Sequence, residues 1–200
     1  MRIKKNIIYL FIPLILVTSC KKSDSDQGDQ FYNNKQYEEA IVAFTDFLEN
    51  NPRNINAIYT RGRSYEELGQ LDEAETDFKS ALALDDKNVQ VLLSLSNLYQ
   101  KMQKHELALL YADNATEIHG APAMAFLLKG RAYHQLGNTE EAMKGYNSAI
   151  KRNPQFGQAF YYRGMLKLVT DKKQGACGDF KLAIDFNNQQ ANTALAQYCK

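Results

Sequence analysis

The chain of 200 residues repeats itself every 34 residues, and no insertion breaks this register between residues 21 and 190. One position of the period is always alanine, and its copies are Ala40, Ala74, Ala108, Ala142 and Ala176. Four residues later most units carry an aromatic ring, namely Phe44, Phe78, Tyr146 and Phe180. A fixed period of this length is the signature of an elongated stack, in which each unit buries its apolar face only against its neighbours. The sequence therefore predicts about five stacked units.

Each unit is expected to contain two helices. Residues that stop helices interrupt the apolar pattern at regular places, such as 67–70 within a unit and 153–154 between units. Three glycines share one place in the first helix of their units: Gly62, Gly130 and Gly164. A glycine inside a helix costs about 1 kcal/mol relative to alanine, so this register indicates a close approach of two backbones. We expect these glycines to face alanines of the second helices, namely Ala74, Ala142 and Ala176.

Two units carry the fullest form of the pattern. The second unit has Ile58, Gly62, Tyr65, Ala74, Phe78 and Ala81, and the fourth has Phe126, Gly130, Tyr133, Ala142, Tyr146, Ala149 and Pro154. This pattern resembles the tetratricopeptide repeat, a helix-turn-helix unit of the same period. The resemblance implies an all-α fold over residues 29–200: a right-handed helical solenoid of about five 34-residue helix-turn-helix repeats, with a truncated C-terminal capping helix at 191–199. The repeats would span 21–54, 55–88, 89–122, 123–156 and 157–190.

The N-terminus carries a separate pattern. Basic residues within 1–6 precede an apolar run at 7–17, which is too short to span a membrane. The run ends in Thr18-Ser19-Cys20 and resembles the lipobox of bacterial lipoproteins. The resemblance implies a signal peptide at 1–19, attachment of palmitate or a similar acyl chain to Cys20, and a polar tether at 20–28. The alternative is an ordinary secretory signal with an incidental cysteine.

The residue after Cys20 bears on where such a lipoprotein would be held. It is Lys21, whereas aspartate at this place is the usual inner-membrane retention signal in the lipoproteins that this N-terminus resembles. We therefore expect a protein of the bacterial cell envelope that is lipid-anchored in the outer membrane, on either its periplasmic or its surface face.

Composition and motifs narrow the class of function. The chain has 24 Lys and Arg against 23 Asp and Glu, a balance that argues against a nucleic-acid partner. Neither a glycine-rich phosphate loop nor a zinc-binding spacing of Cys and His occurs. The three histidines stand apart from one another, at His105, His119 and His134. We therefore predict a protein without catalytic residues, without a metal site and without a cofactor.

The resemblance also assigns a binding surface. In tetratricopeptide repeats, ligands lie against the second, fifth, ninth, twelfth and thirteenth places of each unit, on the first helix. Carried over to this chain, these places give ten groove residues: Tyr59, Arg63, Glu66, Leu93, Asn97, Leu127, Arg131, His134, Tyr161 and Met165. We expect four of them to be well exposed on one continuous face, namely Tyr59, Arg63, Arg131 and Tyr161. For Leu93 and Leu127 the alternative is packing against neighbouring helices.

The expected function is a membrane-anchored, non-catalytic scaffold for protein–protein interaction, which binds a peptide or a partner protein in its concave groove. One alternative is a structural subunit of an envelope machine that assembles outer-membrane proteins or pili, in which the convex or terminal face makes the contact. Another is a glycan-binding module that uses the rings of Tyr59 and Tyr161.

Two cysteines remain if Cys20 carries a lipid. Cys177 lies near the start of the second helix of the fifth unit, and Cys199 lies near the end of the truncated last helix. Adjacent helices should run antiparallel and bring these ends together, and an exported protein meets an oxidising compartment. The spacing also resembles the tails of other bacterial repeat lipoproteins. We predict a disulfide between Cys177 and Cys199; the alternative is two unrelated buried thiols.

Overall fold

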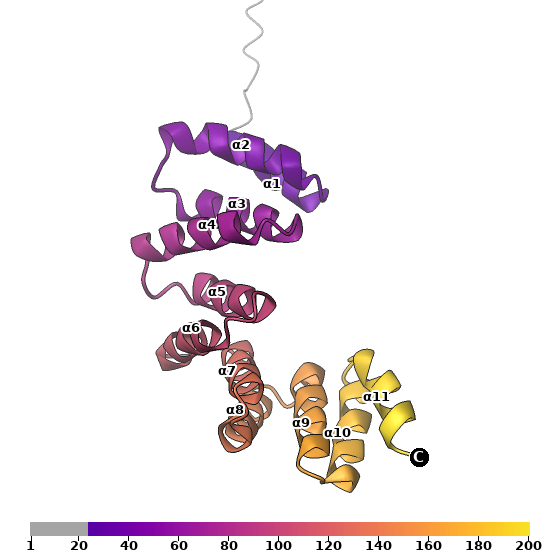
Figure 1. Ribbon diagram of the computed structural model, residues 1–200. Coiled ribbons are helices and arrows are strands. Elements are labelled where there is room, and N and C mark those ends of the chain that lie inside the picture. The colour runs from indigo at the N-terminus through magenta and orange to yellow at the C-terminus, as the bar shows by residue number, and fades with distance from the viewer. Residues whose placement is uncertain (1–23) are drawn as a thin grey trace, which may run out of the picture.

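The computed structural model describes residues 24–200, and all regular structure in that range is helical (Figure 1). Eleven helices follow one another there, and each packs against the next along the chain. Their bounds are α1 Asp24–Asn33, α2 Tyr37–Asn50, α3 Ile55–Glu67, α4 Leu71–Leu84, α5 Val89–Lys101, α6 His105–Glu117, α7 Ala123–Gln135, α8 Thr139–Arg152, α9 Gly157–Val169, α10 Lys173–Asp185 and α11 Gln190–Tyr198. Five helix pairs and one short final helix form the predicted helical solenoid, so the predicted fold class is confirmed.

The turn inside each unit has the same backbone conformation at one register position. Gly69 and Gly137 adopt the left-handed conformation there, with φ of 75° and 79°. The other three units place Lys35, Gln103 and Asp171 at this position, with φ between 56° and 61°. Glycine adopts this conformation without steric cost, whereas a residue with a Cβ does not. The period therefore fixes the turn geometry even where the sequence does not supply glycine.

The glycines at the helix crossing lie against aromatic rings. A Cβ placed on Gly130 would come within 2.7 Å of the Tyr146 ring, and one on Gly164 within 2.6 Å of the Phe180 ring. Of the expected alanines, Ala142 and Ala176 lie farther away, with backbone oxygens at 3.1 and 3.3 Å, and the nearest atoms to a Cβ on Gly62 belong to Phe78 and Asp77 instead of Ala74. The close approach is thus confirmed, but the group that the glycine makes room for is the aromatic ring.

Two buried ion pairs join helices at equivalent places of the second and fifth units. The guanidinium of Arg61 donates to both carboxylate oxygens of Asp77, at 2.8 and 2.7 Å, and Arg163 does the same with Asp179, at 2.9 and 2.7 Å. Each arginine also donates to one side chain of the preceding second helix, and the two acceptors are Thr45 and Asn147. The pairs were not predicted, although Arg and Asp recur 16 residues apart in both units.

The first unit is more complete than expected. Helix α1 begins at Asp24, so residues 24–28, predicted to be tether, form its first turns. Gly28 is buried against the ring of Phe44 and repeats the role of the other crossing glycines. The predicted signal peptide at 1–19 and the lipidation of Cys20 lie outside the described residues. Within the described range, no helix combines the length and apolar character that crossing a membrane requires.

A disulfide joins Cys177 of α10 to Cys199, which directly follows α11, with 5.7 Å between the two Cα atoms. The predicted pairing is therefore confirmed. Apart from this bond, α11 is held by Ala191 and Ala194, which are buried in the core of the fifth unit. The disulfide and these two alanines therefore hold α11 on α10.

Removal of this disulfide should loosen the C-terminal end. Closing a loop of 22 residues is expected to stabilise a protein by roughly 3 kcal/mol in the chain-entropy model. We expect the double variant Cys177→Ser/Cys199→Ser to lose about this much unfolding free energy in urea titrations, and amide exchange in α11 to accelerate first. A count of two free thiols on the unreduced wild-type protein would contradict the account.

Candidate binding groove

One face of the stack is built from the first helices of successive units. Helix α1 contacts α3, α5 contacts α7, and α7 contacts α9. A cleft of about 320 Å³ crosses four of these helices, α3, α5, α7 and α9. It is lined by Tyr59, Arg63, Glu66, Gln90, Leu93, Ser94, Asn97, Met124, Leu128, Arg131 and Gln158. A second hollow of about 280 Å³ shares Tyr59 and Arg63 with the cleft and continues to Asp29 and Tyr32 of α1.

The structure brings six of the ten predicted groove residues into this cleft: Tyr59, Arg63, Glu66, Leu93, Asn97 and Arg131. Five further lining residues were not predicted. Two of them, Ser94 and Leu128, take the sixth place of their units, and the other three are Gln90, Met124 and Gln158. These three share the second place of their units, which is among the ligand-facing places of the repeats that the chain resembles. The 34-residue period together with these ligand-facing places was therefore a sufficient signal to find Gln90, Met124 and Gln158.

The other four predicted residues do not line the cleft. The assignment of Leu127 to the groove is wrong, because its side chain is 0% exposed and packs in a core cluster with Ala142 and Tyr146. Tyr161 and Met165 are half-buried against the core of the fifth unit. These apolar side chains serve the stacking of units.

His134 lies beside the cleft and turns toward the second helix of its own unit. Its Nδ1 atom lies 3.2 Å from the hydroxyl oxygen of Tyr146. Burial lowers the pKa of His134, which favours the neutral ring. Burial also raises the pKa of Tyr146, so its hydroxyl stays protonated. This pair stabilises the fourth unit and offers no charge to a ligand.

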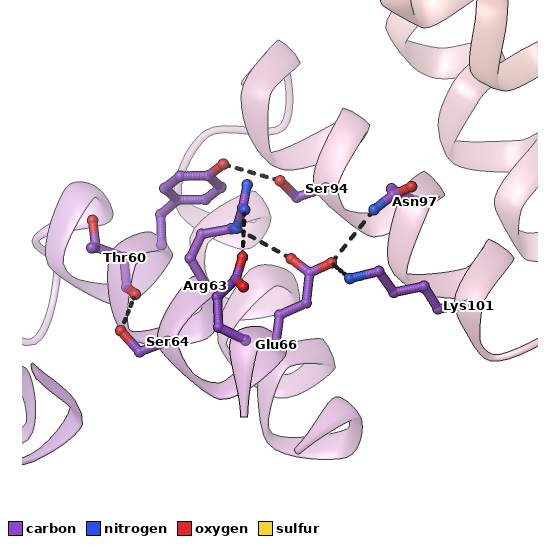
Figure 2. Close-up of polar contacts among 9 residues, drawn as sticks. Thr60, Arg63, Ser64, Glu66, Ser94, Asn97 and Lys101 are labelled. Carbon is purple, nitrogen blue, oxygen red and sulfur yellow. Dashed lines mark hydrogen bonds and ion pairs between the residues drawn. The ribbon is translucent and has the colours of Figure 1, made fainter. Parts of the chain in front are cut away.

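Glu66 organises the floor of the cleft, as Figure 2 shows. Its Oε1 atom accepts a hydrogen bond from Lys101 Nζ at 2.7 Å and a longer one from Asn97 Nδ2 at 3.5 Å, and its Oε2 atom lies 3.2 Å from Arg63 Nε. The carboxylate is almost fully buried, so it requires such partners. Because Arg63 and Glu66 belong to α3 whereas Asn97 and Lys101 belong to α5, this network fixes the spacing of two neighbouring first helices.

Tyr59 also links neighbouring units. Its hydroxyl lies at hydrogen-bond distance, 3.0 Å, from Ser94 Oγ of α5, and its ring centre is 5.6 Å from that of Phe78. Tyr161, its counterpart in the fifth unit, packs in the same way on Phe180, at 6.2 Å. The expectation that these two rings are well exposed is therefore wrong: both are half-buried, since each covers the aromatic ring at the helix crossing. Arg63 and Arg131, which were also expected to be well exposed, are half-buried as well.

Arg131 has the least engaged guanidinium of the cleft. Its central carbon lies 4.9 Å from the centre of the Tyr162 ring, and stacking of this kind leaves the N–H groups at the edges of the guanidinium free to donate. Among the described residues it has no hydrogen-bond or ion-pair partner. Arg63, by contrast, pairs with Glu66 at 3.2 Å and with Glu67 at 3.3 Å. Arg131 is thus the cation of the cleft that retains capacity for an anionic ligand group.

The lining of the cleft suits recognition of an extended chain. Amide side chains at Gln90, Asn97 and Gln158 can exchange hydrogen bonds with a peptide backbone, and Leu93 and Met124 supply apolar contact area. In the part of the chain that the structure describes, no cluster of His, Cys, Asp and Glu is arranged to hold a metal ion.

Comparison with known proteins supports this view of the fold. Models of the tetratricopeptide repeat match residues 55–88 and 124–156, so the chain contains such repeats. Among solved structures, a crystal structure of MamA is similar with a TM-score of 0.72 and 21% identity, covering 82% of this chain and 96% of that one. PilW, described as a widely conserved type IV pilus biogenesis factor, gives a TM-score of 0.75 at 21% identity, covering 82% and 76%. YrrB, described as having an unusual peptide-binding site, gives 0.69 at 20% identity, covering 87% and 90%.

Curated relatives are similar in sequence but much longer. Tetratricopeptide repeat protein 6 of Homo sapiens is 28% identical over 155 residues, which cover 76% of this chain and 30% of that protein. Anaphase-promoting complex subunit 3 of Schizosaccharomyces pombe is 22% identical over 163 residues, which cover 82% of this chain and 24% of that protein. The matched part of the chain therefore spans less than a third of the length of either relative. Proteins built from such repeats act in general as scaffolds for protein–protein interaction.

Proposed function

We propose that this protein is a membrane-tethered, non-catalytic scaffold that holds an extended peptide or a segment of a partner protein in the cleft across α3, α5, α7 and α9. The observation that carries the proposal is the continuity of this cleft over four units, with amides, apolar side chains and a free guanidinium along it. A surface of this shape suits an elongated ligand that contacts several repeats at once.

The charge of the cleft specifies the ligand further. Glu66 is neutralised by Arg63 and Lys101, whereas Arg131 has no carboxylate partner within the described range. An acidic side chain or a terminal carboxylate of the ligand would accept hydrogen bonds from the guanidinium of Arg131. Hydrogen bonds to a charged group contribute about 1.5–3 kcal/mol. The proposal therefore includes an acidic ligand residue near α7.

Replacement of Arg131 tests this part of the proposal. In binding measurements on an array of synthetic eight-residue peptides, we expect the wild-type protein to select peptides with Asp or Glu at one position. We expect Arg131→Gln to weaken the binding of these peptides by about tenfold, which corresponds to about 1.4 kcal/mol, and to leave the melting temperature unchanged. Arg53→Gln is a matched control, because Arg53 is exposed in the turn before α3. Equal binding by Arg131→Gln and wild type would contradict an acidic contact at this position.

The membrane tether is proposed from the lipobox-like residues 17–20 and the polar segment that follows them. If Cys20 is acylated, wild-type protein should partition into the membrane fraction and incorporate a palmitate analogue. Cys20→Ser should abolish the labelling and leave soluble or uncleaved protein. Unchanged membrane partitioning together with an unchanged mature mass would contradict the anchor.

A structural role in an envelope assembly machine is the second candidate. It is supported by the similarity in fold to PilW, whose description is that of a pilus biogenesis factor. Such a role predicts one partner in fixed stoichiometry in cross-linked envelope fractions, whereas a peptide-binding groove predicts several weaker partners. The glycan-binding alternative loses support, because Tyr59 and Tyr161 are half-buried on Phe78 and Phe180 and present no exposed aromatic platform.

A further inference from the structure

The N-terminal end of the stack carries a hollow that is separate from the groove. It has a volume of about 660 Å³ and lies between α1 and α2, which form one end of the solenoid (Figure 1). Its floor is apolar and consists of Phe31, Val42 and Ala43. Val42 is 60% exposed in the middle of α2, a helix that buries Ala40, Phe44 and Leu48. A single exposed valine is common on protein surfaces, and the hollow is a candidate docking surface because a charged rim accompanies this apolar floor.

Two of the four other repeats, the second and the fifth, carry an ion pair at the equivalent place. Arg61 and Arg163 each lie at a junction of three helices: their own first helix, the second helix of the same unit and the second helix of the preceding unit. The residue at this place in the first unit is Gln27, and the partner position of Asp77 and Asp179 is Ala43. Two uncharged side chains thus stand in place of the ion pair, and both line the hollow. No described helix takes the third position.

The rim of the hollow identifies the charge of its occupant. Four acidic residues line it, namely Glu38, Glu39, Asp46 and Glu49, and no basic residue does. None of these carboxylates takes part in an ion pair among the described residues, and Glu39 accepts only a long hydrogen bond, 3.4 Å, from Gln36. Some carboxylates of other second helices do find lysines, as Glu140 and Glu141 do with Lys144. An unpaired acidic rim attracts a basic partner and disfavours an acidic one.

We propose that this hollow docks a basic amphipathic helix of a partner protein, in the position that α2 takes on α3 and α8 takes on α9. The apolar face of that helix would cover Phe31 and Val42, and its lysine or arginine side chains would pair with the rim of α2. This surface is distinct from the groove, so one molecule can hold a peptide in the groove and a basic helix at its end.

The chain itself supplies a suitable probe for the test. A synthetic peptide of residues 138–152 contains α8. In the protein, α8 packs on α9 in the arrangement proposed for the partner helix, and its Asn147 accepts a hydrogen bond from Arg163 of α9. Replacing Glu140 and Glu141 by lysine in the peptide makes its first turn basic. We expect the basic peptide to bind the full-length protein in fluorescence anisotropy titrations, more weakly at higher salt, and the unmodified peptide to bind at least about threefold less tightly.

Two variants of the protein separate shape from charge. Gln27→Arg/Ala43→Asp installs the ion pair of the second and fifth units, which fills the hollow at unchanged net charge, and should weaken binding of the basic peptide about tenfold or more. Glu38→Gln/Asp46→Asn leaves the shape intact and should weaken binding by about threefold to tenfold and reduce its salt dependence. Both variants should keep the wild-type melting temperature to within a few degrees, because the altered side chains lie at the surface.

Several outcomes would overturn the inference. They are equal binding by the wild type and the filled variant, equal affinity for the basic and the unmodified peptide, and nuclear magnetic resonance shifts confined to the groove helices instead of α1 and α2. Self-association of the protein that the filled variant abolishes would show that a second copy, not a foreign basic helix, occupies the hollow. None of these outcomes bears on Arg131, so the proposed groove function is tested independently.

Discussion

Replacing Phe78 by alanine is expected to lower the free energy of unfolding by about 3–5 kcal/mol, the usual cost of removing a large buried aromatic ring. Phe78 is 0% exposed, and its ring covers the backbone of Gly62 and the ring of Tyr59. A cavity at this crossing separates α3 from α4 and also removes the support of the groove residue Tyr59. Urea titrations followed by circular dichroism measure the loss.

The neighbouring glycine provides an internal check. Gly62→Ala should destabilise the wild type, because the new Cβ would come within 2.9 Å of the Phe78 ring, even though alanine is the better helix former by about 1 kcal/mol. In a Phe78→Leu background the same change should cost much less, because the contact with the ring is gone and the next nearest atom is Asp77 Cβ at 3.0 Å. Additive effects of the two substitutions would show that the ring does not dictate glycine at this position.

Replacing Asp179 by alanine is the second substitution with a large expected effect. Its carboxylate accepts hydrogen bonds from Arg163 at 2.9 and 2.7 Å and lies 2.8 Å from Lys167 Nζ, while its side chain is only 4% exposed. Removal leaves two cations facing each other without an anion, and breaking a buried pair in this way costs about 3–5 kcal/mol. Thermal and urea unfolding should both report the loss.

Two controls distinguish the loss of the ion-pair attraction from the cost of leaving a buried charged group without a partner. Arg163→Met/Asp179→Leu replaces the main pair by apolar side chains and should cost much less than Asp179→Ala, because no carboxylate or guanidinium of the pair remains buried. Glu141→Gln breaks an exposed pair with Lys144 and should change stability by less than about 1 kcal/mol. If Asp179→Ala is as mild as Glu141→Gln, the three-helix junction does not stabilise the fifth unit.

The fold was largely predictable because one period governs it. Repetition fixes where helices turn, so even Lys35, Gln103 and Asp171 adopt the left-handed turn that glycine marks at Gly69 and Gly137. The disulfide was predictable for a related reason, since antiparallel neighbours bring Cys177 and Cys199 together. The period does not determine which side chain of a unit packs against the glycine at the helix crossing. The ring of Tyr146, not the side chain of Ala142, therefore lies on Gly130.

The repeat pattern predicted which positions can line the groove, but it did not predict how exposed the side chains at these positions are. Tyr59 and Leu127 occupy the same place of their units, yet Tyr59 lines the cleft whereas Leu127 is wholly buried. The difference lies in the neighbours: Tyr59 bonds across to Ser94 of the next unit, and Leu127 packs in the core of the fourth unit. The hollow beside Val42 gave no sequence signal of its own, because it arises from the small side chain of Ala43 and from its position at the end of the stack.

The central claim is that the cleft formed by the first helices, and not the outer face of the second helices, contacts the ligand. Photo-crosslinking compares the two faces directly, with benzoylphenylalanine placed either at Leu93 in the cleft or at Leu110 on α6, which is 49% exposed and lies outside the cleft. The protein should be crosslinked in the cells that produce it, and its adducts resolved by mass. The account predicts covalent adducts from the Leu93 position that Arg131→Gln diminishes, and none from Leu110. Adducts from Leu110 alone would contradict it.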